Sequence, residues 1–234
     1  MNVEPIYKMA RLYASVVPWS DNMLSPYPFH QGYHVMEDNK LVALTEDTYQ
    51  AFVTRNTERM IEYSKKGDDP LGSLFMFMSK PYRLEFLDLC KDMIPVEQIG
   101  KLLSWIWTAT EFPNLNGVSR WIKLFQMVDK STLMNEEELQ GYNALPDEVV
   151  AYRGILTGKG KARAMSWTLS KEKAEWFAGR WGHGGQVYSA KVKKQNIFAY
   201  FTGRGEDEIV VNSRKLLEVV LVYNVDKKPD GDLR

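Results

Sequence analysis

Apolar residues recur every three to four positions from about residue 46 to residue 130, which is the period of helices that bury one face. The clearest run is Ile99, Leu102, Leu103 and Ile106. After residues 145–147 the period shortens to two, in brief stretches of β-branched and aromatic residues that are typical of strands. The sequence therefore predicts helices first and strands afterwards, an α+β fold rather than alternating βαβ units.

Residues that cap helices mark where two of the predicted helices begin. Thr45 stands before a helix expected to run to Lys66, where the Gly-Asp-Asp-Pro stretch at residues 67–70 ends it. Asn135 and Glu138 have the spacing of a capping box, which opens one more short helix. These local signals place helix ends independently of the apolar period.

The C-terminal part is predicted to be mostly strands with one helix among them. Ser170 is expected to cap that helix, and Ala174, Phe177 and Ala178 to form its buried face. The predicted strands are 149–152, 165–169, 186–192, 197–201, 208–211 and 217–225.

The N-terminal segment is harder to interpret. Residues 1–17 fit a short helix, whereas residues 18–39 are rich in Pro, Gly, Ser and aromatic residues and read as an irregular surface segment. His30 and His34 have the i, i+4 spacing of a helical metal pair. Gly32 lies between them and no Glu is adjacent, so a metal site is not expected.

Composition narrows the class of protein. Hydrophobic residues make up 44% of the 234 residues, enough for a sizeable core. The single cysteine, Cys90, lies in an apolar helical setting and is expected to be a buried thiol in a reducing compartment. The chain shows neither a signal-peptide pattern nor an apolar run of membrane-spanning length, so we expect a soluble, cytoplasmic protein with no membrane partner.

Basic residues gather in the C-terminal part although the net charge of the chain is zero. Residues 151–200 hold ten Lys or Arg and only two acids, Glu172 and Glu175. This bias favours a phosphate-bearing ligand, either a nucleotide or a nucleic acid. A solvated lysine-rich face is the alternative.

An acidic stretch runs directly into a predicted strand. Glu206 and Glu208 are two residues apart, just before the apolar residues 209–211, so a strand that begins at Glu208 brings both side chains to one edge of the sheet. A polar hairpin loop is the plainer interpretation of this stretch taken alone. Upstream, Arg153 ends one predicted strand, and Ser166 and Thr168 lie on the next.

Four motifs in this order resemble the arginine–serine–glutamate class of mono-ADP-ribosyltransferases, which includes the cholera-toxin-like and clostridial toxins and their phage and bacterial relatives. The motifs are Tyr152-Arg153-Gly154, Ser166-Trp167-Thr168, Phe177-Ala178-Gly179-Arg180 and Glu206-Asp207-Glu208-Ile209-Val210-Val211. The resemblance covers about residues 135–225. It implies a mixed, mainly antiparallel two-sheet core at residues 146–234 behind a helical lead-in at 56–145, with residues 1–55 as an extension of unassigned role.

The resemblance also implies how NAD+, the co-substrate, would be bound, with no metal. Arg153, with Gly154 beside it, and Arg180 would contact the diphosphate, which a guanidinium can bind through charge-assisted hydrogen bonds. Phe177 would pack near the nicotinamide. Ser166 would lie beside the catalytic glutamate and the nicotinamide ribose, and Thr168 would support the same strand. The usual Ser-Thr-Ser triplet is changed here, because Trp167 takes the middle position.

The acids would carry the chemistry in this resemblance. Cleavage of the nicotinamide–ribose bond develops positive charge on the sugar, and Glu208 would stabilise that charge with Ser166 beside it. Glu206 would face the acceptor, and a glutamate at this place accompanies arginine acceptors in the family. Arg204 and Phe201 would help to select the target.

The expected function is therefore that of an NAD-dependent transferase of the glycosyltransferase type, which modifies a protein and acts as a bacterial or phage effector or toxin. Three alternatives stay open. The same fold could modify nucleic acid, the site could be a degenerate NAD-binding or target-binding module, or the enzyme could only hydrolyse NAD. The sequence does not indicate an oligomeric state.

Overall fold

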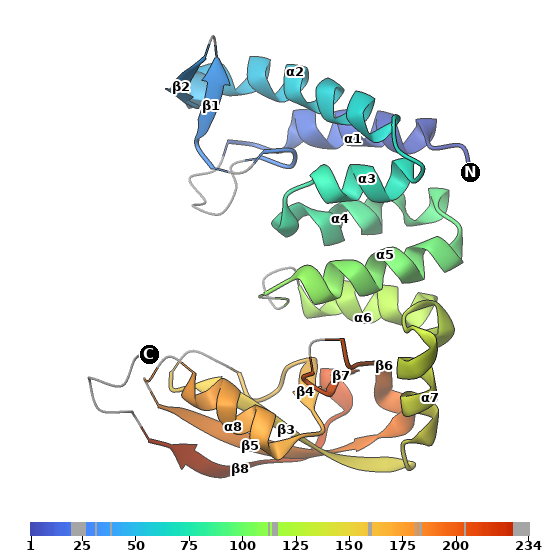
Figure 1. Ribbon diagram of the computed structural model, residues 1–234, viewed down its shortest axis with the longest axis vertical. Coiled ribbons are helices and arrows are strands. Elements are labelled where there is room, and N and C mark those ends of the chain that lie inside the picture. The colour runs from blue at the N-terminus through green and yellow to red at the C-terminus, as the bar shows by residue number, and fades with distance from the viewer. Residues whose placement is uncertain are drawn as a thin grey trace. The chain divides into compact units, whose positions relative to one another are not determined.

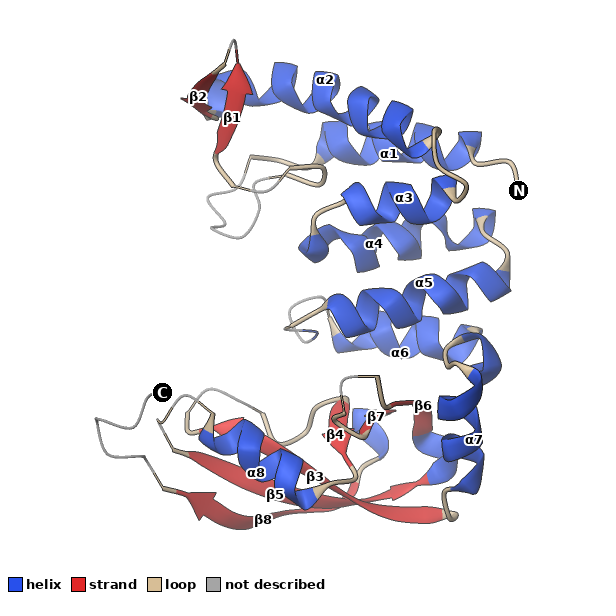
Figure 2. Cartoon of the chain, viewed as in Figure 1, coloured by secondary structure: helices blue, strands red, loops and turns tan. Residues whose placement is uncertain are grey.

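A computed structural model describes residues 1–19, 27–30, 32–37, 39–111, 113, 117–158, 161–180, 182, 184–203 and 205–226. In this part of the chain helices come first, and the strands form two antiparallel sheets, one of two strands and one of six (Figures 1 and 2). The predicted α+β fold, with a helical N-terminal part followed by antiparallel strands, is confirmed. None of the helices in the described ranges has both the length and the apolar character needed to cross a membrane.

The chain divides into two compact units, Met1–Met127 and Val128–Arg234, which we call the helical unit and the sheet unit. The boundary expected at residues 55/56 falls inside a helix, α2 (Glu46–Ser64), which packs against the first helix, α1 (Glu4–Val16). The first 55 residues are therefore part of the helical unit and do not form a separate extension. The helical lead-in expected up to residue 145 is likewise divided at residue 127.

In its described residues, the helical unit contains helices and one small hairpin. Besides α1 and α2, its helices are α3 (Pro70–Phe77), α4 (Lys80–Cys90), the short η1 (Lys91–Met93), α5 (Val96–Ala109) and α6 (Val118–Met127). The hairpin joins β1 (His34–Glu37) to β2 (Lys40–Ala43) through a turn in which Asn39 has a positive φ of 61°. Residues 34–37 thus form a strand, where the sequence suggested an irregular segment.

Aromatic residues fill the core between α5 and α6. The rings of Trp107 and Trp121 meet edge to face with centroids 4.9 Å apart, and Phe125 packs against both. All three are buried. Edge-to-face and stacked pairs add to the hydrophobic gain of burial, so this cluster fixes the pairing of the two helices.

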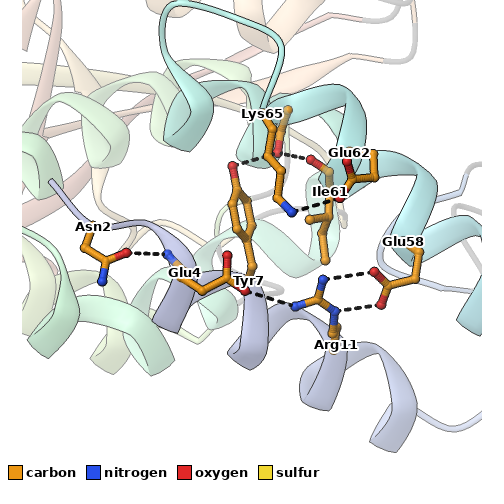
Figure 3. Close-up of polar contacts among 9 residues, drawn as sticks. Asn2, Glu4, Tyr7, Arg11, Glu58, Ile61, Glu62 and Lys65 are labelled. Atoms are coloured by element: carbon orange, nitrogen blue, oxygen red, sulfur yellow. Dashed lines mark hydrogen bonds and ion pairs between the residues drawn. The ribbon is translucent and has the colours of Figure 1, made fainter.

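Polar contacts tie α1 to α2 at their exposed margin (Figure 3). Arg11 donates to both carboxylate oxygens of Glu58, at 2.6 and 2.9 Å. Deeper in the same interface, the hydroxyl of Ser64 donates to the hydroxyl oxygen of Tyr7 at 3.1 Å. The interface between the two helices combines a partly exposed ion pair with a buried hydrogen bond between two hydroxyl groups.

The sheet unit places six strands in the order β6-β7-β4-β3-β5-β8, and all paired neighbours are antiparallel. The strands are β3 (Glu148–Leu156), β4 (Ser166–Thr168), β5 (Gly185–Lys193), β6 (Ile197–Phe201), β7 (Glu208–Val211) and β8 (Leu217–Val225). Its helices are α7 (Glu136–Ala144), α8 (Lys171–Gly179) and the short η3 (Lys130–Thr132), η4 (Lys194–Asn196) and η5 (Ser213–Lys215).

The close approach of α8 to β3 depends on Gly154. A Cβ atom added at Gly154 would lie 1.9 Å from the carbonyl oxygen of Ala174 and 2.7 Å from the amide nitrogen of Ala178. Only glycine allows the helix backbone to come so near the strand. Ala174 and Ala178 are fully buried in this contact.

Predicted helix starts agree with the structure at three positions. Thr45 and Asn135 each form a reciprocal capping box, and the side chain of Ser170 accepts a hydrogen bond from the amide of Lys173. Phe177 differs from its prediction, because it is only half-buried while its neighbours on α8 form the apolar contact with the sheet.

Candidate active site

The site forms around β4, the shortest strand of the six-stranded sheet. Thr168 pairs with Glu208 of β7, and Ser166 pairs with Val210. On its other side β4 pairs with β3 at a single position, Thr168 with Tyr152. A three-residue strand between two longer ones thus brings side chains from β3, β4 and β7 together.

Ser166 and Glu208 are joined directly. The hydroxyl of Ser166 donates to carboxylate oxygen Oε1 of Glu208 at 2.6 Å, a distance typical of a charge-assisted hydrogen bond. Glu208 is only 5% exposed. Keeping a carboxylate at this depth costs desolvation energy, which the hydroxyl offsets in part.

Arg153 lies beside this pair. Its Nη1 donates to the carbonyl oxygen of Ser166 at 2.6 Å, and its Nε donates to the carbonyl oxygen of Lys161 at 3.2 Å. Burial lowers the pKa of Arg153 to about 10, and the negative charge of Glu208 opposes that shift. The guanidinium therefore stays protonated at neutral pH and places a positive charge next to the buried carboxylate.

Thr168 holds the loop that leads into β7. Its hydroxyl donates to the carbonyl oxygen of Glu206 at 2.5 Å and accepts a hydrogen bond from the amide of Ser170 at 3.0 Å. Thr168 therefore acts on the backbone of Glu206 and fixes where the side chain of that residue begins.

Asp207, between the two glutamates, is held from both sides. It has a positive φ of 46°, its carbonyl oxygen accepts from the amide of Leu169 at 3.0 Å, and the hydroxyl of Tyr200 donates to its carboxylate at 3.2 Å. A non-glycine residue in this conformation is strained, and the strain persists only where surrounding contacts maintain it. The loop before Glu208 is therefore fixed by at least two contacts.

Phe177 and Arg180 form a second group at the C-terminal end of α8. The guanidinium carbon of Arg180 lies 5.4 Å from the centroid of the Phe177 ring and 5.8 Å from that of Trp176. This geometry is that of a cation–π contact at an exposed position. The two rings meet edge to face with centroids 5.0 Å apart.

The structure thus brings five of the predicted residues into one hydrogen-bonded group: Arg153, Ser166, Thr168, Glu206 and Glu208. Phe177 and Arg180 contact each other on α8. Gly154 contributes close packing under α8.

Trp167 accounts for the altered middle position of the serine–threonine motif. Its indole is almost completely buried, and its N–H donates to the carbonyl oxygen of Ala164 at 2.9 Å. Because side chains alternate along a strand, position 167 faces away from Ser166 and Thr168. The tryptophan therefore serves the core and leaves both hydroxyls in place.

Two further expectations concerned residues that select a target. Phe201 is buried, so it belongs to the core and does not offer a surface to a partner. Arg204 lies outside the described residues. Tyr200 and Asp207, which fix the loop, were not singled out from the sequence, because nothing local indicates that they contact each other.

No metal centre accompanies the group in the part of the chain that the structure describes, where no three His, Cys, Asp or Glu side chains are arranged around a common point. His30 and His34 are instead linked by a hydrogen bond between Nε2 of His30 and the carbonyl oxygen of His34, at 3.0 Å. Cys90 is buried as expected, and that burial raises the pKa of its thiol to about 12.

Comparison of the chain with protein-family models, with curated proteins and with solved structures finds no match.

Proposed function

We propose that the protein is an NAD-dependent mono-ADP-ribosyltransferase that modifies a protein. The observation that supports this most is the 2.6 Å hydrogen bond between Ser166 and the buried carboxylate of Glu208, with the cationic Arg153 donating to the same strand. Ionisable groups whose pKa values are shifted by burial and by a charged partner are typical of functional sites. The order of the four motifs supports the same reaction class.

The chemistry assigns a task to each residue. The nicotinamide–ribose bond breaks with its electron pair leaving on nicotinamide, and the sugar carbon becomes positively charged. Glu208, held by Ser166, stabilises that charge, and such fixed electrostatic groups contribute about 10²–10³ in rate. Arg153 binds the diphosphate with Arg180 as a second phosphate contact, and Phe177 packs near the nicotinamide. NAD+ is consumed as a co-substrate, and no metal takes part.

Glu206 acts on the acceptor. A carboxylate two residues before the catalytic one orients a guanidinium and removes its proton as the new bond to the sugar carbon forms. This favours arginine in a target protein. Thr168 supports the role because it holds the backbone of Glu206 by a 2.5 Å hydrogen bond. The protein would then act as a phage or bacterial effector or toxin in the cytoplasm.

A second candidate function is ADP-ribosylation of nucleic acid at the same site. The observation that favours it is the charge of residues 151–200, which hold ten basic residues against two acids. An excess of basic residues favours binding of a phosphate backbone.

Labelled NAD incubated with the protein and a cell lysate tests these functions. We expect acid-insoluble label that protease removes and nuclease does not. Label removed by nuclease would favour the second function, and free nicotinamide without label would indicate hydrolysis alone. If the protein gives neither label nor nicotinamide, and Glu208→Ala changes nothing, the enzymatic proposal is wrong.

A further inference from the structure

A hollow in the helical unit lies beside helix α2. It is a cavity of about 430 Å³ within the range typical of small-molecule sites. It is formed by three segments: the residues before the hairpin, strand β1, and the middle of α2. Its lining residues are His30, His34, Val35, Met36, Phe52, Arg55, Asn56 and Arg59.

Helix α2 presents one continuous face to the cavity. Phe52, Arg55, Asn56 and Arg59 are spaced i, i+3, i+4 and i+7, so they lie on one side of the helix. Phe52 and Asn56 are buried, while the two arginines are exposed. The face therefore has an apolar floor with cationic groups at its rim.

The rim is basic, and no acid occurs among the described residues that line the cavity. Arg55 and Arg59 carry permanent positive charge. Burial lowers the pKa of His30, the hydrogen bond to the carbonyl oxygen of His34 opposes this shift, and the charge of Arg59 adds to it, so that the net shift is downward and the imidazole is neutral at pH 7. Two arginines at the rim attract a ligand that carries a negatively charged group, which their guanidinium groups can bind through charge-assisted hydrogen bonds.

Hydrogen bonds hold the lining in place before any ligand arrives. Asn56 donates from Nδ2 to the carbonyl oxygen of Phe29 at 2.8 Å, and Arg59 donates to Oδ1 of Asn56 at 2.5 Å. His30 meets the ring of Phe52 edge to face with centroids 5.0 Å apart. A preformed lining lowers the entropy cost of binding.

We propose that this cavity binds a nucleoside monophosphate, with the phosphate at Arg55 and Arg59 and the base over the apolar floor at Phe52 and Val35. Two properties of the lining favour a nucleoside monophosphate as the ligand. Two arginines four residues apart suit a phosphate, and the apolar and aromatic floor would stay in contact with water if inorganic phosphate alone were bound. The site is separate from Glu208 in sequence and belongs to a different unit.

Equilibrium dialysis of the full chain with labelled AMP tests the proposal. The measurement uses the Arg153→Ala background, so that any nucleotide binding at the site in the sheet unit is weakened. We expect one saturable AMP site, with adenosine and inorganic phosphate each binding at least 10-fold more weakly. The double variant Arg55→Gln/Arg59→Gln should lose at least 10-fold in affinity.

Matched variants distinguish the loss of contacts in the cavity from a general loss of positive charge on the helical unit. Lys8→Gln/Lys66→Gln removes the same charge from exposed positions of the helical unit that do not line the cavity, and should bind AMP as the background does. Met36→Glu adds a negative charge at a lining position that is 66% exposed, so it should weaken AMP binding without loss of folding. Absence of saturable AMP binding, equal binding by the Arg55/Arg59 variant, or equal affinity for inorganic phosphate would overturn the proposal.

Discussion

Polar side chains of the helical unit and of the sheet unit can be compared by the partners they bind. In the helical unit, two buried side chains donate to backbone carbonyls: Asn56 to Phe29, and Arg83 to Met78, both at 2.8 Å. In the sheet unit, Ser166 donates to another side chain, the carboxylate of Glu208. The first arrangement satisfies backbone carbonyl groups, while the second offsets part of the desolvation cost of a buried charge.

The sheet unit itself contains the control for this comparison. Glu138 is also buried, but its two carboxylate oxygens accept from the backbone amides of Asn135 and Thr202, at 3.1 and 3.0 Å. It closes the start of α7 and connects that helix to the end of β6. A buried acid is thus no sign of a site by itself. The partners of Glu208 make the difference.

The largest effect on stability should come from Gly154→Ala, which should destabilise the sheet unit and leave the stability of the helical unit unchanged. The new methyl group would meet the backbone of α8 at 1.9 Å, so the helix must move, at a cost of about 3 kcal/mol. Urea unfolding with hydrogen exchange should show lost protection in β3 and α8 and retained protection in α5 and α6.

Gly203→Ala is the matched control, because a Cβ atom there meets nothing within 4 Å. Its stability should stay within about 0.5 kcal/mol of the parent. Equal stability of the Gly154 and Gly203 variants would contradict the close packing of α8.

Asn56→Ala tests the structural role of buried polar groups in the helical unit. Loss of the amide leaves the carbonyl of Phe29 without this donor, and we expect the unit to lose about 2 kcal/mol of unfolding free energy. NAD turnover by the folded protein should stay unchanged. Thr54→Ala, at an exposed position of the same helix, should change stability by less than about 0.5 kcal/mol. If Asn56→Ala lost NAD turnover without losing stability, the purely structural role assigned to Asn56 would be contradicted.

Arg153→Ala tests whether a charged side chain of the sheet unit serves ligand binding, in contrast to the structural role of Asn56. We expect the dissociation constant for NAD to rise at least about 10-fold, or 1.4 kcal/mol, because a charge-assisted contact to the diphosphate is lost. Calorimetric titration measures it. Arg163→Ala is the control, since Arg163 donates to the carbonyl oxygen of Leu216. NAD affinity equal to that of the parent in the Arg153 variant would sink the assignment.

The smallest expected effect is the pH dependence of the Arg11–Glu58 pair. The hydrogen bond from Arg11 lowers the pKa of Glu58 below its usual 4.5, so the pair stabilises the folded state above that pH. This stability is lost as the pH falls through the lowered pKa. Because both side chains are more than a third exposed, the contribution stays below about 1 kcal/mol. Arg11→Gln should reduce the slope of stability between pH 5 and 3, and an unchanged slope would contradict it.

Local signals in the sequence predicted much of the sheet unit. The bounds expected for β6, β7 and β8 agree with the structure, because each is a run of β-branched and aromatic residues between turns. The cap residues Thr45 and Asn135 were equally predictable, since their bonds reach only three residues along the chain. The β1–β2 hairpin was missed, because its four-residue strands lie beside a segment rich in Pro and Gly.

The candidate site was predictable as a set of residues but not as a geometry. Motif order identified Arg153, Ser166 and Glu208, whose contacts depend on β4 pairing with β7 more than 40 residues later. The need for glycine at position 154 arises from the backbone of α8, about 20 residues away. The cavity beside Arg59 was not foreseen, because three separate segments form it.

NAD turnover by Glu208→Gln tests the central claim most directly. The substitution keeps the shape of the side chain and removes its charge, and Glu218→Gln does the same at an exposed acid of β8. We expect nicotinamide release and acceptor labelling by Glu208→Gln to fall at least about 100-fold, with the NAD dissociation constant within about twofold of the parent. Glu218→Gln should behave as the parent does. Turnover by Glu208→Gln at the parental rate would contradict the assignment of this carboxylate and the proposed reaction with it.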